Sequence, residues 1–164
     1  MTKIFRTTFT VLLLFSSIAS AEIGISDWNS AGISLFMKKT VVVTLLGSPD
    51  GNEGTMEWYD ISNNEGLERV SLEYLDTDMV QAMALSFRPG SIDLDTLGSI
   101  VQGAFPGIPE VHRDEHMAVF IGRSTDTDET VYFLAMADAP DKDKGPELIT
   151  MSEKANRFFL DRKE

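Results

Sequence analysis

One string of residues in this chain has the types and spacing of a metal site, His112-Arg113-Asp114-Glu115-His116. It matches the pattern H-x-x-E-H, in which two imidazoles bind zinc and support hydrolysis. The pattern requires a helix that presents both imidazoles on one face. Here the string follows Pro109 and runs directly into a strand-like segment, and alternating strand geometry separates His112 from His116. Three interpretations stay open: a zinc site on His112, Glu115 and His116, a pH-sensitive or ligand-contacting loop, and the solvated entrance to a strand, which the pattern favours.

Four short acidic clusters raise the question of calcium binding. They are Asp76 with Asp78, Asp93 with Asp95, Asp126 with Asp128 and Glu129, and Asp138 with Asp141, Asp143 and Glu147. Calcium needs many oxygen ligands that converge from a loop of defined turns, and no cluster has the order D-x-D-x-D-G. Aspartate in turns and at helix starts commonly accepts hydrogen bonds from nearby amides. Turn and cap chemistry is therefore the favoured interpretation, and segment 138–147 is the best-placed calcium candidate.

Other catalytic motifs are missing from the sequence. It has no G-x-S-x-G string, phosphate loop or dinucleotide-binding fingerprint, and both histidines lie in the one string already described. It also has no cysteine, which excludes disulfides and thiolate metal sites. We therefore predict a protein that is not an enzyme and needs no cofactor. A small metal-dependent hydrolase that uses the HRDEH segment is the rival prediction.

The first 21 residues predict export from the cytosol. Lys3 and Arg6 precede a short apolar stretch, and Ala19-Ser20-Ala21 supplies small residues before a cleavage bond to Glu22. The apolar stretch is too short for a spanning helix, and no cysteine follows it for lipid attachment. We predict a signal peptide over 1–21 and a periplasmic or secreted protein without stable membrane insertion after cleavage. An uncleaved anchor is the alternative.

The chain of 164 residues carries a formal net charge of −12. An acidic surface repels phosphate backbones and anionic lipids, so nucleic acid and membrane-surface partners are disfavoured. It attracts basic proteins, although acidity also serves simply to keep an exported protein in solution. Residues 22–164 are enough for a single domain with its own hydrophobic core.

Hydrophobic periodicity predicts an α+β domain with an antiparallel sheet and the element order αβββαββα after the signal peptide. The expected elements are a helix over 33–46, strands over 56–61, 69–75 and 79–87, a helix over 94–104, strands over 117–121 and 130–137, and a last helix that begins at Pro146. The β-branched run 40–44 leaves a strand as the alternative for part of the first element. Ser91 or Asp93 is expected to cap the second helix.

Aromatic residues with a polar edge are candidate contacts for a partner protein. Such residues are enriched at interfaces, although they also lie in or beside hydrophobic cores. Trp28 stands in a polar lead before the first helix, where a core position is less expected. The candidate binding residues are these aromatics and one acidic loop: Trp28, Trp58, Tyr59, Tyr74, Asp126, Asp128 and Glu129.

Two features of the sequence, a residue pattern and the predicted element order, resemble known families. Leu46-Gly47-Ser48-Pro49 followed by Trp58-Tyr59 resembles the helix, LG-x-P, then W-x-Y pattern of the SmpA/BamE family of small envelope proteins. The predicted order αβββαββα and the acidic size class are similar to type III secretion chaperones and their YbjN-like relatives. Both resemblances imply a role in binding another protein.

The sequence as a whole predicts a soluble exported protein-binding module. An inhibitor, an immunity protein and a chaperone-like protein that acts on a basic protein partner all fit this description. An accessory component of envelope assembly is the first alternative, and the metal-dependent hydrolase is the second.

Overall fold

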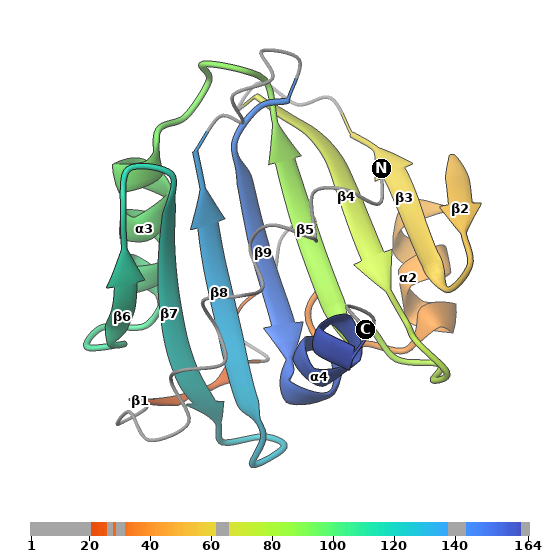
Figure 1. Cartoon of the computed structure of the whole chain (residues 1–164). Coiled ribbons are helices and arrows are strands. Elements are labelled where there is room, and N and C mark those ends of the chain that lie inside the picture. The colour runs from red at the N-terminus through yellow and green to blue at the C-terminus, as the bar shows by residue number, and fades with distance from the viewer. Residues whose placement is uncertain (1–20, 26–27, 29–31, 62–65, 138–143, 162–164) are drawn as a thin grey trace.

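The computed structural model describes residues 21–25, 28, 32–61, 66–137 and 144–161. Within these ranges nine strands form one mixed sheet, and three helices pack against it (Figure 1). The strands are β1 (Ala21–Ile23), β2 (Gly51–Glu53), β3 (Met56–Asp60), β4 (Leu67–Glu73), β5 (Ala82–Phe87), β6 (Glu110–Arg113), β7 (Met117–Ser124), β8 (Thr130–Met136) and β9 (Glu147–Ser152). The helices are α2 (Lys39–Leu46), α3 (Leu94–Ala104) and α4 (Glu153–Asp161).

The sheet order is β1-β7-β8-β9-β5-β4-β3-β2, and β6 also pairs with β7. All pairings are antiparallel except that of β1 with β7, which is parallel. The prediction of a small α+β domain with the order αβββαββα is therefore wrong, because the described chain is mostly β and its sheet is large. The missed strands β1, β2 and β6 have three or four residues each, which is too short for a periodicity to appear.

The predicted helix from Pro146 is also wrong in its first half. Residues 147–152 form β9, and α4 begins only at Glu153. β9 lies between β8 and β5, so both of its edges are paired, and its two faces are covered because Leu148 and Ile149 are buried in opposite hydrophobic clusters. A strand covered on both faces is apolar without interruption and looks like part of a buried helix.

The helix over 94–104 is confirmed as α3, and Asp93 caps it by accepting a hydrogen bond from the Thr96 amide at 2.7 Å. The first predicted helix begins later than expected, at Lys39. Ile33 and Leu35 are buried before it without being helical, and Phe36 has a positive φ of 63°. The chain therefore reaches the core through an irregular segment before α2 starts.

Side chains from the two faces of the sheet form two hydrophobic clusters. The larger one contains Phe120 and Phe133 from the sheet and Leu97 and Val101 from α3. The smaller one contains Leu134, Ile149 and Met151 from the sheet with Ala155 from α4, which lies on the near side of the sheet in Figure 1, while α3 lies beside β6 and β7. Successive residues such as Phe133 and Leu134 thus belong to different clusters, as strand alternation requires.

Trp28 belongs to the larger cluster. It is 7% exposed, and its ring centroid lies 5.7 Å from that of Phe105 and 5.4 Å from that of Phe133. Its indole Nε1 donates a hydrogen bond to Thr150 Oγ1 at 3.1 Å, which satisfies two buried polar atoms in one contact. Trp28 was predicted to stand in a polar lead, where a core position was less expected, but the structure shows that it is a core residue.

Replacing Trp28 tests this core position. We expect Trp28→Ala to lower the free energy of unfolding by about 3–5 kcal/mol, because it removes a large buried ring. Trp28→Phe keeps most of the packing and leaves Thr150 without its donor, so a loss of about 1–3 kcal/mol is expected. Urea unfolding followed by circular dichroism measures both. A Trp28→Ala variant within about 0.5 kcal/mol of the parent would contradict the core position.

Candidate functional site

The H-x-x-E-H string folds as a β-hairpin. His112 and Arg113 end β6, residues 114–116 form the turn, and Met117 begins β7. His112 faces Val119 across the antiparallel pair, and Arg113 faces Ala118. The helix that the zinc pattern requires is therefore not present at this string, and His112 lies on a strand whereas His116 lies in a turn.

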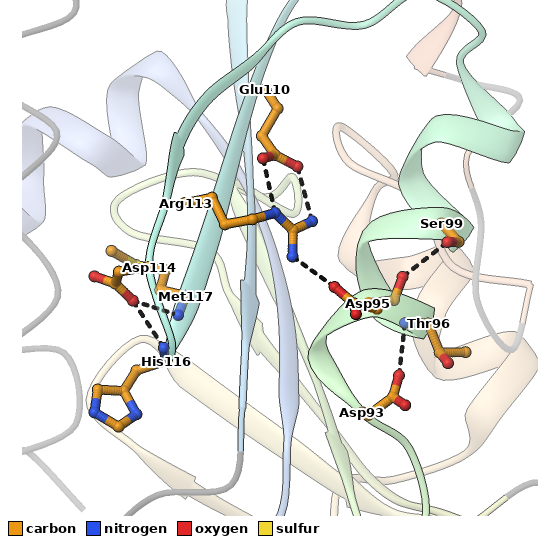
Figure 2. Close-up of polar contacts among 9 residues, drawn as sticks. All are labelled: Asp93, Asp95, Thr96, Ser99, Glu110, Arg113, Asp114, His116 and Met117. Carbon is orange, nitrogen blue, oxygen red and sulfur yellow. Dashed lines mark hydrogen bonds and ion pairs between the residues drawn. The ribbon is translucent and has the colours of Figure 1, made fainter.

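Asp114 organises this turn (Figure 2). Its Oδ1 accepts hydrogen bonds from the amides of His116 and Met117, both at 2.8 Å. Its Oδ2 lies 3.1 Å from His112 Nε2. The amide of His116, followed by the His112 ring, lowers the pKa of Asp114 below its usual range. His116 Nε2 lies 3.2 Å from Glu115 Oε1. Each imidazole thus has a different carboxylate beside it. Across the described residues no three histidine, cysteine or acidic side chains form a group that could hold a metal ion.

Arg113 connects the hairpin to α3. Its Nε and Nη2 each lie 2.8 Å from an oxygen of Glu110, and its Nη1 lies 2.8 Å from Asp95 Oδ1 (Figure 2). The two-pronged contact with Glu110 raises the pKa of the guanidinium. Asp95 therefore pairs with an arginine, whereas Asp93 caps the helix. Asp95 thus connects α3 to β6 through Arg113, while Asp93 stabilises the start of α3. Sequence spacing did not reveal the role of Asp95, because Arg113 is distant in the chain.

A groove of about 660 Å³ lies between the start of α3 and the turn of the hairpin. Its lining residues are Gly90, Ser91, Ile92, Asp93, Leu94, Thr96, Glu115, His116 and Ala137. The side chains of Glu115 and His116 are largely exposed, and the Asp93 carboxylate already accepts the Thr96 amide. The groove therefore offers a ligand only exposed hydrogen-bonding groups that are in contact with solvent.

The second acidic candidate, Asp126 with Asp128 and Glu129, lies at the turn between β7 and β8. Ser124 Oγ accepts the amides of Asp126 and Thr127 at 3.2 and 3.3 Å, and Asp128 has a positive φ of 59°. Arg123 Nε donates to Asp128 Oδ1 at 2.7 Å, which lowers the pKa of that carboxyl. This geometry is the turn chemistry that the sequence favoured over calcium.

The other acidic clusters are spread out. Asp76 and Asp78 are exposed in the turn that follows β4. Asp138, Asp141 and Asp143 lie outside the described residues. Glu147 belongs to β9, where its Oε1 accepts a hydrogen bond from Ser86 Oγ at 2.9 Å, and burial raises its pKa.

Two of the candidate aromatic contacts, Tyr59 and Tyr74, are buried beneath the start of α2. Burial raises the pKa of both phenols. Lys39 Nζ lies 2.5 Å from Glu57 Oε1 and 5.0 Å from the centroid of the Tyr74 ring. The exposed Lys39 and the buried Glu57 form a polar connection between α2 and β3. Tyr59 and Tyr74 are internal groups in this structure and do not line the surface.

Trp58 is the candidate aromatic that keeps a partly exposed side chain. Its ring covers Gly51 of the neighbouring strand, where an added Cβ would lie 2.1 Å from the indole. The guanidinium of Arg69 lies 5.9 Å from the ring centroid. Trp58 thus covers the face of the sheet where β3 pairs with the edge strand β2.

The structure reveals an apolar surface that the sequence prediction missed. Of the large apolar side chains in the described ranges, four are exposed, and three of them belong to α2: Val41 (44%), Val43 (38%) and Leu45 (54%). The fourth is Ile100 on α3, at 41%. Val41 and Leu45 are four residues apart and share one face of the helix, whereas Val43 lies on a different face. We call these three exposed side chains the α2 surface. Its signal was present in the segment KTVVVTLL, which is apolar on most of its circumference, whereas a core-facing helix needs one stripe.

Comparisons with known proteins give no family for this chain. No family model matches it, and no significant match was found among curated proteins or solved structures. The resemblance of Leu46–Pro49 and Trp58-Tyr59 to small envelope proteins stays a prediction. The resemblance to secretion chaperones rested on an element order that is not the observed one. No helix of the described chain is long and apolar enough to span a membrane.

Removing the Asp114 carboxylate tests its role in the hairpin turn. We expect Asp114→Ala to lower the free energy of unfolding at pH 7 by about 1–2 kcal/mol, because two amides lose their acceptor. The folded-state pKa is lowered, so the carboxylate stabilises the fold above its ordinary pKa, and this contribution disappears as the pH falls through the folded-state value. The difference between variant and parent, measured by urea unfolding, should therefore shrink below about pH 4. Asp76→Ala, in an exposed turn, is the control, and a difference that does not change with pH would count against the assignment.

Glu147 gives the opposite dependence on pH. Its folded-state pKa is raised by burial, so the ionised carboxyl is unfavourable in the fold at neutral pH, and stability from this group increases as the pH falls through the folded-state value. Glu147→Gln keeps an acceptor for Ser86, and we expect a higher thermal midpoint than the parent at pH 7. This gain should vanish near pH 4, where the parent side chain is protonated. Glu53→Gln on the exposed edge is the control; a lower midpoint for Glu147→Gln at pH 7 would refute this view.

Proposed function

We propose that this protein is an exported acidic module that binds a basic protein partner through the α2 surface. The observation that carries the proposal is the exposure of Val41, Val43 and Leu45 on one short helix. Scattered single apolar residues are ordinary on protein surfaces, whereas a concentration of them marks an interaction site. α2 buries Val42 and packs Leu46 partly against the larger cluster, so Val41, Val43 and Leu45 are the apolar side chains that remain available to a partner.

The composition of α2 supports a role beyond its own stability. Valine loses side-chain freedom in a helix, and α2 has three in succession. Its N-cap residue Lys38 makes no side-chain cap, the first turn has no acidic residue and the last turn has no basic one. The helix is held by Val42 and Leu46, which pack on the larger cluster, by the hydrogen bond from the Lys39 amide to the Asp78 carbonyl, and by the contact of Lys39 with Glu57. Departures from local sequence rules without structural compensation are expected at functional surfaces.

Charge indicates the kind of partner. The chain carries a net charge of −12, and exposed Asp50 and Glu53 follow α2 in the sequence. The C-terminal end of a helix has a partial negative charge, and no basic residue offsets it here. A partner that presents apolar side chains beside lysine or arginine complements this surface. Apolar contact then supplies affinity, and the acidic field guides the approach of the partner.

The proposal includes export of the protein from the cytosol. The basic start, the short apolar stretch and Ala19-Ser20-Ala21 support removal of residues 1–21 and release into the periplasm or the exterior. An inhibitor, an immunity protein or a chaperone-like escort acts in this way, by occupying a basic surface of another protein.

A test begins with capture of a partner from envelope extracts and measurement of its affinity. We expect Leu45→Glu to weaken binding at least about tenfold, or about 1.4 kcal/mol, because it places a charge in an apolar contact. The matched control is Ile100→Glu, which makes the same kind of change at a similarly exposed position on α3 and should leave the affinity within about twofold. Both variants should keep the thermal midpoint of the parent, and added salt should weaken binding.

Three results would contradict the proposal, and a fourth would change the role assigned to the protein. Equal weakening by Leu45→Glu and Ile100→Glu would remove α2 as the contact, and a partner of acidic isoelectric point would remove the charge argument. Hydrolytic turnover that is lost in His112→Ala would favour the metal-dependent hydrolase. Capture of an outer-membrane complex, with binding that still depends on Leu45, would favour the envelope assembly role over an inhibitor.

A further inference from the structure

The bond that the sequence predicts for signal-peptide cleavage, Ala21–Glu22, lies inside a strand of the sheet. β1 runs parallel to β7, with Ala21 opposite Gly122, Glu22 opposite Arg123 and Ile23 opposite Ser124. Ala21 is partly buried against the larger cluster. Both residues of the bond are therefore part of the folded sheet.

Contacts that follow this bond hold β1 in place. Ile23 is buried, and its side chain fills the space above Gly122, where an added Cβ would lie 2.6 Å from Ile23 Cδ1. The Ile23 carbonyl accepts hydrogen bonds from the Thr125 amide at 2.9 Å and the Thr125 hydroxyl at 3.3 Å. Ile25 and Trp28 are buried shortly after it. The first residues of the mature chain thus build part of the core.

We propose that folding closes the cleavage site, so that the Ala21–Glu22 bond is cut only while β1 is detached from β7. This inference rests on the proposed export. Hydrolysis adds one water molecule across the amide and leaves a carboxylate on Ala21 and an α-ammonium on Glu22, with the peptidase as catalyst. A peptidase needs an accessible segment of chain, and a strand paired in a sheet offers its backbone only after local opening.

The proposal sets the order of events during maturation. Cleavage comes first, and β1 then docks, with Glu22 opposite Arg123 and Ile23 in contact with Ser124 and Thr125. A precursor that folds completely before it meets the peptidase protects its own leader. The pairings of β1 with β7 and of β5 with β9 join distant parts of the chain, and such pairings form slowly, which leaves time for this order.

The test compares cleavage of one bond in two contexts by purified bacterial signal peptidase. The substrates are the folded full-length precursor and a synthetic peptide that covers residues 13–30. We expect the peptide to be cut at Ala21–Glu22 and the folded precursor to be cut at least about tenfold more slowly, because cleavage waits for opening. Mass spectrometry of the product identifies the new N-terminus.

Variants at Gly122 release β1 without changing any residue next to the bond. Gly122→Val should displace Ile23 and speed cleavage of the folded precursor towards the rate of the peptide, and Gly122→Ala is the milder variant if the first does not fold. Gly145→Ala is the matched control, because its Cβ would lie 1.9 Å from the Phe87 carbonyl oxygen and so strains the fold away from β1. Circular dichroism confirms that each precursor is folded.

The outcomes separate this inference from the export proposal. A peptide that is not cut at Ala21–Glu22 rejects the export proposal and this inference with it. A peptide that is cut while the folded parent is cut equally fast rejects the inference alone. Equal acceleration by Gly122→Ala and Gly145→Ala also rejects it, since protection would then come from the whole fold instead of β1.

Discussion

Burial on both faces of the central strands β8 and β9 is the constraint on which the rest of the structure depends. Phe133 and Leu134 are adjacent in the chain and fully buried on opposite sides of the sheet. One side requires α3 and Trp28 to cover it, and the other requires α4. Because hydrophobic burial is the main favourable contribution to folding, these two contacts decide where the helices lie. Elements farther from these two strands, such as α2, bury fewer side chains in the core and can instead contact a partner.

Sequence patterns predicted the parts of the fold that have local causes. Asp93 with Thr96 marks the start of α3, and the alternation over Arg69 to Tyr74 marks a strand, because capping and one-sided burial leave a trace within a few residues. β9 was predicted as a helix because a strand covered on both faces has no alternation. β1, β2 and β6 were missed because their partners supply the reason for their extended shape.

The candidate site divides in the same way. The turn roles of Asp114 and Asp128 follow from local hydrogen bonds. The sequence favoured such a role for Asp128, whereas for the string that contains Asp114 it favoured the solvated entrance to a strand. The ion pair of Arg113 with Asp95 and the burial of Tyr59 and Tyr74 depend on distant residues, and no spacing in the chain predicts them. The α2 surface was missed for another reason. An apolar segment is normally assumed to face the core, and only the structure shows that Leu45 does not.

We propose that α2 is the element that contacts a basic partner. Backbone hydrogen–deuterium exchange of the protein alone and in complex with its captured partner tests this contact. We expect the amides of Lys39–Leu46 to exchange more slowly in the complex and those of the β6–β7 turn at 114–116 to be unchanged. Slower exchange confined to residues 114–116, with α2 unaffected, would contradict it.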